Sequence, residues 1–146
     1  MDKIRNFIKA EEGFRSVPYL CTEGYWTAGW GHNFDAHGEP VPAFVTNDTA
    51  EEYLTADIDN ASRDARSVVS SYNWLNDARR AVMISMAFQL GRRGLSTFTR
   101  MIAAINKGHY NLAAHEMLDS KAFRQTPGRI ARQALMLATG NWPGEE

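Results

Sequence analysis

The sequence predicts an α+β protein in which a small N-terminal β-hairpin lobe is joined by a long helix to an all-helical C-terminal lobe. Residues 14–31 lack helical periodicity and are rich in glycine and aromatic residues, which is typical of a hairpin with tight turns. From residue 49 onward, apolar residues recur at intervals of three and four, as they do on one face of a helix. We therefore expect a single domain, residues 1–146, with lobes at about 13–60 and 61–146 plus the N-terminal helix.

The N-terminal part is expected to contain a helix, a hairpin and a loop. Three apolar residues share one face of a first helix that runs to about Glu12: Ile4, Phe7 and Ile8. The tetrapeptide at residues 21–24, Cys-Thr-Glu-Gly, separates two short apolar segments and predicts the hairpin turn. Residues 33–47 are rich in Pro, Gly, Asn and Asp, so we expect a loop with room for one more short strand.

A long helix is predicted to follow this loop. Residues 49–52, Thr-Ala-Glu-Glu, match the capping-box pattern that opens a helix. The next apolar residues form one continuous stripe over about five turns: Leu54, Ile58, Ala61, Ala65, Val68 and Tyr72. A helix of this length could link two lobes.

The C-terminal part is predicted to be helical throughout. The segment that begins at Asn76 is apolar nearly all round, so we expect a helix that is buried in the second lobe and ends at Gly91. Three further helices are expected, with starts at Ser96, about Asn111 and residues 126–127 and with ends near residues 107–108, Asp119 and Gly140.

Composition narrows the class of protein. A hydrophobic share of 44% and a charged share of 23% are ordinary for a soluble globular protein. The single cysteine excludes an internal disulfide framework. The chain has no apolar run as long as a membrane span, and its N-terminus lacks the apolar region of a signal peptide. We therefore expect neither a disulfide-rich fold nor membrane insertion.

Charge is distributed unevenly along the chain. Residues 1–73 hold 6 Lys and Arg against 12 Asp and Glu, which gives −6, whereas residues 74–146 hold 10 against 5, which gives +5. A basic half suits an anionic partner such as nucleic acid or an acidic cell-wall polymer. The alternative is that two oppositely charged lobes simply attract each other.

The densest group of reactive side chains lies in residues 12–32. It places the carboxylate of Glu12 at an expected helix end, followed on the hairpin by the thiol of Cys21, the hydroxyl of Thr27 and the imidazole of His32. Glycines mark positions that need unusual backbone dihedrals or close approach to another segment. Glycines and aromatic residues gathered around so few polar groups indicate the floor of a cleft.

The spacing of Glu12, eight residues, Cys21, five residues and Thr27 resembles the catalytic signature of the T-even-type phage lysozymes, glycoside hydrolase family 24. The likeness continues in order along the chain in T-E-G-Y-W-T-A-G-W-G-H, A-V-M-I-S-M-A-F-Q-L-G, Q-T-P-G-R and T-G-N-W. The resemblance implies a lysozyme-like fold with a cleft between the lobes. It also implies hydrolysis of the β-1,4 bond between N-acetylmuramic acid and N-acetylglucosamine in peptidoglycan, for host cell lysis.

The resemblance implies a role for each matching residue. Glycosidic cleavage needs an acid to protonate the leaving oxygen and a group on the opposite face that guides water or stabilises the cation. Glu12 matches the acid, and Thr27 matches the position that helps to hold the attacking water. His32 matches a structural residue that pairs with Asp57 on the long helix. Four residues match positions that bind the sugar or approach the acid across the cleft: Phe88, Gln89, Phe98 and Arg129.

Cys21 departs from the family pattern, because most relatives have aspartate at this second catalytic position. A free thiol is mostly protonated at neutral pH, so little of it is available as a base, whereas a carboxylate is ionised there. Cys21 could instead be a small buried hydrophobe, the usual fate of a lone cysteine. Two alternatives to the hydrolase therefore stay open: a lytic transglycosylase, and a catalytically degenerate protein that only binds peptidoglycan.

Peptidoglycan is the expected partner, and no cofactor is expected. A metal at His32 is not expected, because no second ligand lies at a familiar sequence spacing. Nucleic acid is not expected either, because recognised motifs are absent and most aromatic residues lie in the acidic half. We expect a monomer that accumulates in the host cytoplasm and reaches the periplasm and cell wall through a separate, holin-like pore.

Overall fold

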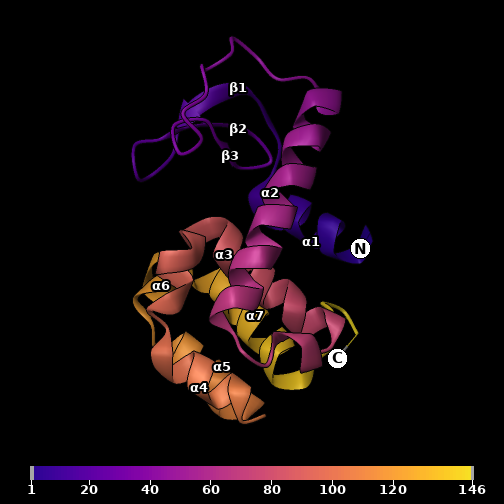
Figure 1. The fold of residues 1–146 in the computed structure, drawn as a ribbon, viewed down its shortest axis with the longest axis vertical. Coiled ribbons are helices and arrows are strands. Elements are labelled where there is room, and N and C mark those ends of the chain that lie inside the picture. The colour runs from indigo at the N-terminus through magenta and orange to yellow at the C-terminus, as the bar shows by residue number, and fades with distance from the viewer. Residues whose placement is uncertain (1, 146) are drawn as a thin grey trace. The chain divides into compact units, whose positions relative to one another are not determined.

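The computed structural model describes the backbone of residues 2–145 and the side chains of residues 3–145. The chain divides into two compact units, residues 1–59 and 60–146. The first contains helix α1, a small antiparallel sheet and the start of the long helix α2, and the second contains the rest of α2 and the remaining helices (Figure 1). This composition confirms the predicted α+β class. None of the described helices is long and apolar enough to cross a membrane.

The sheet of the first unit has the order β1-β2-β3, with β1 Arg15–Leu20, β2 Trp26–Gly29 and β3 His32–Asn33. The predicted hairpin between β1 and β2 is confirmed. The amide of Cys21 donates to the carbonyl of Tyr25 at 2.9 Å, and the amide of Gly24 donates back to the carbonyl of Cys21 at 2.9 Å. The register pairs Leu20 with Trp26 and Tyr19 with Thr27.

A small apolar cluster supports this sheet. It consists of the buried residues Ala28, Phe34, Val45 and Ala50, with Trp30 and Tyr53 packed against it. Gly29 is required where β2 meets this cluster. Its φ is +65°, and an added Cβ would lie 3.2 Å from the Cβ of Ala50. The sheet can therefore approach the first turn of α2 closely.

Helix α2, Asn47–Val68, begins earlier than the capping box predicted. The hydroxyl of Thr46 accepts the amide of Thr49 at 3.2 Å, so Thr46 satisfies the free N–H of the first turn and Thr49 already lies inside the helix. The predicted apolar stripe is confirmed from Leu54 to Ala65, whose members are buried. Tyr72 lies beyond the helix, in the short 3-10 helix η1, Tyr72–Trp74.

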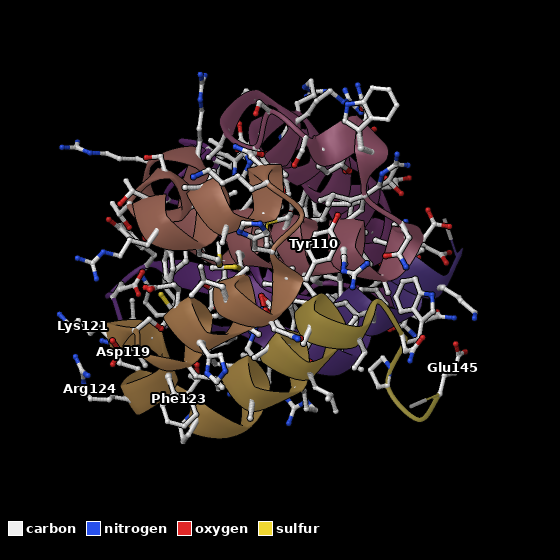
Figure 2. All side chains as sticks on the ribbon, turned by 90° about the horizontal axis from the view of Figure 1, so that it is seen from below. Tyr110, Asp119, Lys121, Phe123, Arg124 and Glu145 are labelled. Atoms are coloured by element: carbon white, nitrogen blue, oxygen red, sulfur yellow. The ribbon has the colours of Figure 1, made fainter. Side chains whose placement is uncertain are left out.

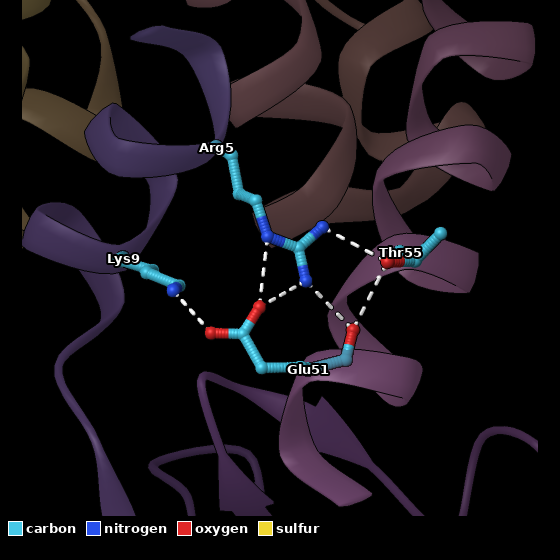
Figure 3. Close-up of polar contacts among 4 residues, drawn as sticks. All are labelled: Arg5, Lys9, Glu51 and Thr55. Carbon is cyan, nitrogen blue, oxygen red and sulfur yellow. Dashed lines mark hydrogen bonds and ion pairs between the residues drawn. The ribbon is translucent and has the colours of Figure 1, made fainter. Parts of the chain in front are cut away.

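Helix α1, Asp2–Glu12, is joined to α2 by a polar cluster within the first unit (Figure 3). The carboxylate of Glu51 accepts from Arg5 Nε at 2.9 Å and also from Lys9. Arg5 further donates to the carbonyl of Glu51 at 2.8 Å and to the hydroxyl of Thr55 at 2.9 Å. The hydrogen bonds from Lys9 and then Arg5 lower the pKa of Glu51. The apolar face of α1 is buried, as the periodicity predicted.

Helix α3, Asp77–Ser96, contributes a continuous buried segment to the apolar core of the second unit. Asn76 caps it by accepting the amide of Arg79 at 3.1 Å, and Ala81 through Ala87 are all buried, which confirms the predicted buried helix. Gly91 breaks the regular helix there, with φ 74° and ψ 171°, but helical turns resume after it. The predicted helix therefore does end at Gly91, and a second, short helical segment follows it within the element labelled α3.

The remaining helices are α4 Thr99–Asn106, α5 Tyr110–Leu118, α6 Lys121–Gln125 and α7 Pro127–Thr139. The prediction that Ser96 caps α4 was wrong. Its hydroxyl donates to the carbonyl of Arg93 at 2.6 Å, and α4 begins after Phe98 without a side-chain cap. Helix α6 was not predicted. Ser120 caps it by accepting the amide of Phe123 at 3.2 Å, and five residues are too few to show a periodicity.

The side chain of Arg79, on α3, contacts both α7 and α5. Its guanidinium donates to the carbonyls of Leu137 at 2.8 Å and Ala138 at 3.0 Å and lies 3.7 Å from the ring centroid of Tyr110, which is labelled in Figure 2. Helix α7 ends at Gly140, as predicted, with φ +74°. A Cβ there would lie 2.9 Å from the Arg79 guanidinium, so glycine keeps this contact possible.

Candidate active site

Glu12 is the last residue of α1, where the sequence placed it. The amide of Gly13 donates to the carbonyl of Lys9 at 2.9 Å and closes the final turn, with Gly13 at φ +70°. The side chain of Glu12 is half-buried. A carboxyl at this position is fixed at the junction between α1 and β1 and still reachable from solvent.

The hairpin brings Cys21 and Thr27 together with a residue that sequence reasoning missed, Tyr19. Tyr19 and Thr27 are directly paired across the two strands, so their side chains lie on the same face of the sheet. Cys21 follows Tyr19 by two residues, which by strand alternation puts it on the same side, at the start of the turn. This face, formed by Tyr19, Cys21 and Thr27, is called the hairpin face below.

Electrostatics connect Glu12 to the hairpin face. Burial raises the pKa of Tyr19, the negative charge of Glu12 raises it further, and Cys21 adds a smaller effect in the same direction. The guanidinium of Arg15, 4.4 Å from the ring centroid of Tyr19, opposes this shift. Tyr19 therefore lies within electrostatic range of both Glu12 and Cys21. Its alternation with Cys21 was the sequence signal that could have identified it.

Thr27 and Cys21 differ in exposure. Thr27 is 5% exposed, and its hydroxyl donates to the carbonyl of Tyr25 at 3.1 Å. Because that bond uses the hydroxyl proton, the remaining lone pairs of Thr27 can accept a hydrogen bond from water. Cys21 has a free thiol of intermediate exposure, so it is not the buried hydrophobe that was the alternative. The thiol is therefore accessible to water and small reagents at the hairpin turn.

His32 and Asp57 form the predicted pair within the first unit. His32 Nδ1 lies 2.8 Å from Asp57 Oδ2, and the ring is only 3% exposed. Sequence reasoning missed Glu39, whose Oε1 lies 2.6 Å from His32 Nε2. Burial by itself lowers the pKa of His32, but the hydrogen bonds with Asp57 and Glu39 outweigh it, so the pKa is raised above its usual value. His32 therefore joins β3, the following loop and α2.

The predicted sugar-binding residues lie in the second unit. Phe88 is half-buried and Gln89 exposed, both on α3. Phe98, at the start of α4, lines a pocket of about 470 Å³ whose wall also contains Asp119 and Lys121, which lie at one edge of the helical unit in Figure 2. The pocket combines an aromatic surface with charged groups of both signs.

Arg129, on α7, is positioned by a buried polar group that the sequence did not reveal. Its guanidinium donates to the hydroxyl of Ser85 at 3.1 Å, and Gln133 Nε2 donates to the same hydroxyl at 3.0 Å. Ser85 and Gln133 are 0% and 1% exposed. Two polar residues inside otherwise apolar helix faces were the signal that could have identified this group.

Comparison with known proteins identifies a family and several relatives. The sequence model of the family described as phage lysozyme matches residues 9–135. The chain is 28% identical over 158 residues to the pre-baseplate central spike protein Gp5 of Enterobacteria phage T4, covering 92% of this chain but 27% of that protein. It is 26% identical over 166 residues to probable T4-type lysozyme 1 of Dictyostelium discoideum, covering 96% of each. An endolysin of Acyrthosiphon pisum secondary endosymbiont phage 1 is 28% identical over 111 residues, covering 76% of this chain and 72% of the endolysin.

Proposed function

The chain belongs to the phage lysozyme family, and on that premise we propose that it is an inverting muramidase that hydrolyses the β-1,4 bond between N-acetylmuramic acid and N-acetylglucosamine. Membership supports a glycosidase-type lysozyme that degrades peptidoglycan. The observation that carries the finer proposal is the placement of a half-buried carboxyl, Glu12, in electrostatic range of a face that bears a hydroxyl and a thiol.

In this mechanism Glu12 is the general acid. It protonates the glycosidic oxygen as the bond to the anomeric carbon breaks, and water attacks that carbon from the opposite side of the sugar ring. Thr27 accepts a hydrogen bond from this water, since its own proton is engaged by Tyr25. Cys21 orients the same water through weak hydrogen bonds, and a thiolate at this position would accept its proton.

In this proposal, residues of the second unit bind the substrate. Phe88 and Phe98 offer apolar surface to the sugar rings, while Gln89 and Arg129 offer hydrogen-bond donors to its polar groups. The hydrogen bond from Arg129 to Ser85 fixes the guanidinium, so less side-chain entropy is lost when a ligand binds.

A lytic transglycosylase is the second candidate, and Cys21 is the observation that favours it. Such an enzyme needs one good acid and base and no carboxylate to activate water, so a thiol at the second catalytic position would be tolerated. A protein that only binds peptidoglycan is the third possibility. These candidates differ in the products they release.

Digestion of purified sacculi followed by mass spectrometry tests the proposal. Hydrolysis leaves reducing muramic acid ends, whereas transglycosylation leaves 1,6-anhydro ends that are lighter by one water. Reducing ends support the muramidase, anhydro ends support the transglycosylase, and binding without any cleavage supports the degenerate protein. We further propose that the enzyme acts as a monomer, without nucleic acid or a cofactor, and reaches the wall through a separate holin-like pore.

A further inference from the structure

A second group of ligand-type side chains lies in the first unit, away from the hairpin face. It consists of His32 on β3, His37 in the following loop and Asp57 on α2. One ring nitrogen of each histidine and a carboxylate oxygen of Asp57 all lie within 4.8 Å of one another. We propose that these three residues bind a divalent transition-metal ion of the zinc class, which nothing in the lysozyme chemistry above requires.

The hydrogen bonds of the two histidines favour this assignment. A metal-bound histidine usually donates its other ring N–H to a carboxylate or a backbone carbonyl, which fixes the ring and its tautomer. His32 Nε2 lies 2.6 Å from the carboxylate of Glu39, which leaves Nδ1 facing Asp57. His37 Nδ1 lies 2.8 Å from the carbonyl of Asn33, which leaves Nε2 facing Asp57. Both rings are thus held with their other nitrogen, the one that could become a metal ligand, toward the same carboxylate.

Metal binding would require only small changes in the distances between the ligand atoms. At a tetrahedral zinc ion, nitrogen and oxygen ligands about 2.0–2.1 Å from the metal are roughly 3.3 Å apart. His32 Nδ1 lies 2.8 Å from Asp57 Oδ2, and His37 Nε2 lies 3.7 Å from Asp57 Oδ1. A bound cation would take the place of the proton between His32 and Asp57, and His37 would tilt inward.

The surroundings allow that movement and give the ion a route to the site. His32 is fixed, because its ring is 3% exposed and stacks on Tyr53 with centroids 4.1 Å apart and planes at 3°. Asp57 is 10% exposed, whereas His37 is 38% exposed and covers the other face of His32 at 4.8 Å. Solvent therefore reaches the site past His37, and water can complete the coordination.

The donor set selects the class of metal. Two imidazoles and one carboxylate suit zinc and other first-row transition ions, whereas calcium and magnesium prefer all-oxygen sites. With one protein ligand each from β3, the following loop and α2, the ion would link these three segments of the first unit. Sequence spacing did not reveal it, because His37 and Asp57 lie 5 and 25 positions beyond His32.

Calorimetric titration of the tag-free, chelator-treated full chain with Zn²⁺ alone tests the proposal. Cys21→Ser is used as the background in every sample, so that the thiol cannot bind the metal. We expect one Zn²⁺ per chain, and a melting temperature raised by about 5–10 °C at zinc concentrations about 100-fold above Kd. Co²⁺ should give the visible absorption of a four-coordinate ion at the same stoichiometry.

His37→Gln is the decisive variant, because it removes one ligand from an exposed position and leaves His32 and Asp57 in place. It should weaken Zn²⁺ binding at least about tenfold and cut the thermal shift at the same zinc concentration to about half or less. His115→Gln, at an exposed position on α5, is the matched control and should bind Zn²⁺ as the background does. Absence of saturable binding, equal affinity in His37→Gln, or an equal loss in His115→Gln would each overturn the proposal.

Discussion

The two units of this molecule are stabilised in different ways. In the first, the apolar cluster behind the sheet is small, and charged contacts such as Arg5 and Lys9 with Glu51 connect the elements. In the second, buried apolar residues of α3, α4, α5 and α7 form the core. The reactive residues Glu12, Cys21 and Thr27 all lie in the first unit. The residues proposed to carry the chemistry therefore share a unit with the titratable contacts named above, and the second unit is expected to be insensitive to pH.

The largest effect is expected at Glu12. Glu12→Gln keeps the side-chain volume but removes the transferable proton, and general acid catalysis contributes about a hundredfold to ten-thousandfold to the rate. Turbidity clearance of permeabilised cells should fall by at least that lower bound, with an unchanged melting temperature. Retention of more than about a tenth of the activity would remove Glu12 as the acid.

The core of the second unit should give a large effect on stability that does not vary with pH. Ile84 is 2% exposed on α3, so Ile84→Ala leaves a cavity and should lower the free energy of unfolding by about 2–5 kcal/mol. Leu135→Ala, at a 45% exposed position on α7, is the matched control and should cost less than about 1 kcal/mol. Denaturant unfolding at acidic and alkaline pH measures both, and a cost for Ile84→Ala that changed with pH would contradict the contrast between units.

Cys21 should matter less than Glu12. We expect Cys21→Asp to retain or raise activity, because a carboxylate is ionised at neutral pH and so available as the base, and Cys21→Ser to lower it. Iodoacetamide should inhibit by filling the water site beside the thiol. Since Cys21 could also act after oxidation to a sulfinate, assays with and without reductant belong in the same series. Full activity in both Cys21→Ser and the alkylated enzyme would show that Cys21 is no catalyst.

The pair of His32 and Asp57 should make the first unit sensitive to pH. The pKa of His32 is raised in the folded chain, so its stabilisation is complete below the unfolded value near 6.5 and is lost as pH rises through the folded value. In chelator-containing buffer, Asp57→Asn should therefore cost about 1–3 kcal/mol near pH 5.5 and clearly less near pH 9. Thermal melts measure the two differences, and equal values would exclude the charged pair as a stabilising element.

The smallest effect is expected at the basic surface of the second unit. Arg92 and Arg93 line a pocket of about 740 Å³ together with Ser96 and Asn106. Replacing both arginines by glutamine should weaken sacculus binding at low ionic strength and matter little at high ionic strength, because salt screens exposed charges. If the salt dependence of co-sedimentation is the same in the double variant and the wild type, the alternative explanation of the uneven charge is favoured, namely attraction between the two oppositely charged lobes.

Sequence reasoning located the elements whose signals are local. The turn at Cys21, the start of a helix at Asn76 and the end at Gly140 each depend on a few adjacent residues, and all three are confirmed. The start of α2 was misplaced because both Thr46 and Thr49 suit a cap, and only the backbone geometry shows which hydroxyl accepts the free amide. Boundaries of this kind depend on tertiary context as well as on local sequence.

The site was predictable to a lesser extent. His32 and Asp57 were paired through the family resemblance, but Glu39 and His37 approach them only because the loop after β3 turns back toward α2. Ser85 is part of an apolar helix in sequence, and its partners Arg129 and Gln133 lie more than forty positions away. Contacts between residues so distant in sequence require the fold, which the patterns of single sequence segments do not supply.

The contact of Arg5 and Lys9 with Glu51 has a consequence for the order of folding. Helix α1 has 11 residues, a length at which an isolated helix is marginal in water. Its charged partner lies 46 and 42 positions later in the chain. During synthesis the first helix therefore gains this stabilisation only after the first turns of α2 have emerged, so α1 is made first and docks on α2 late.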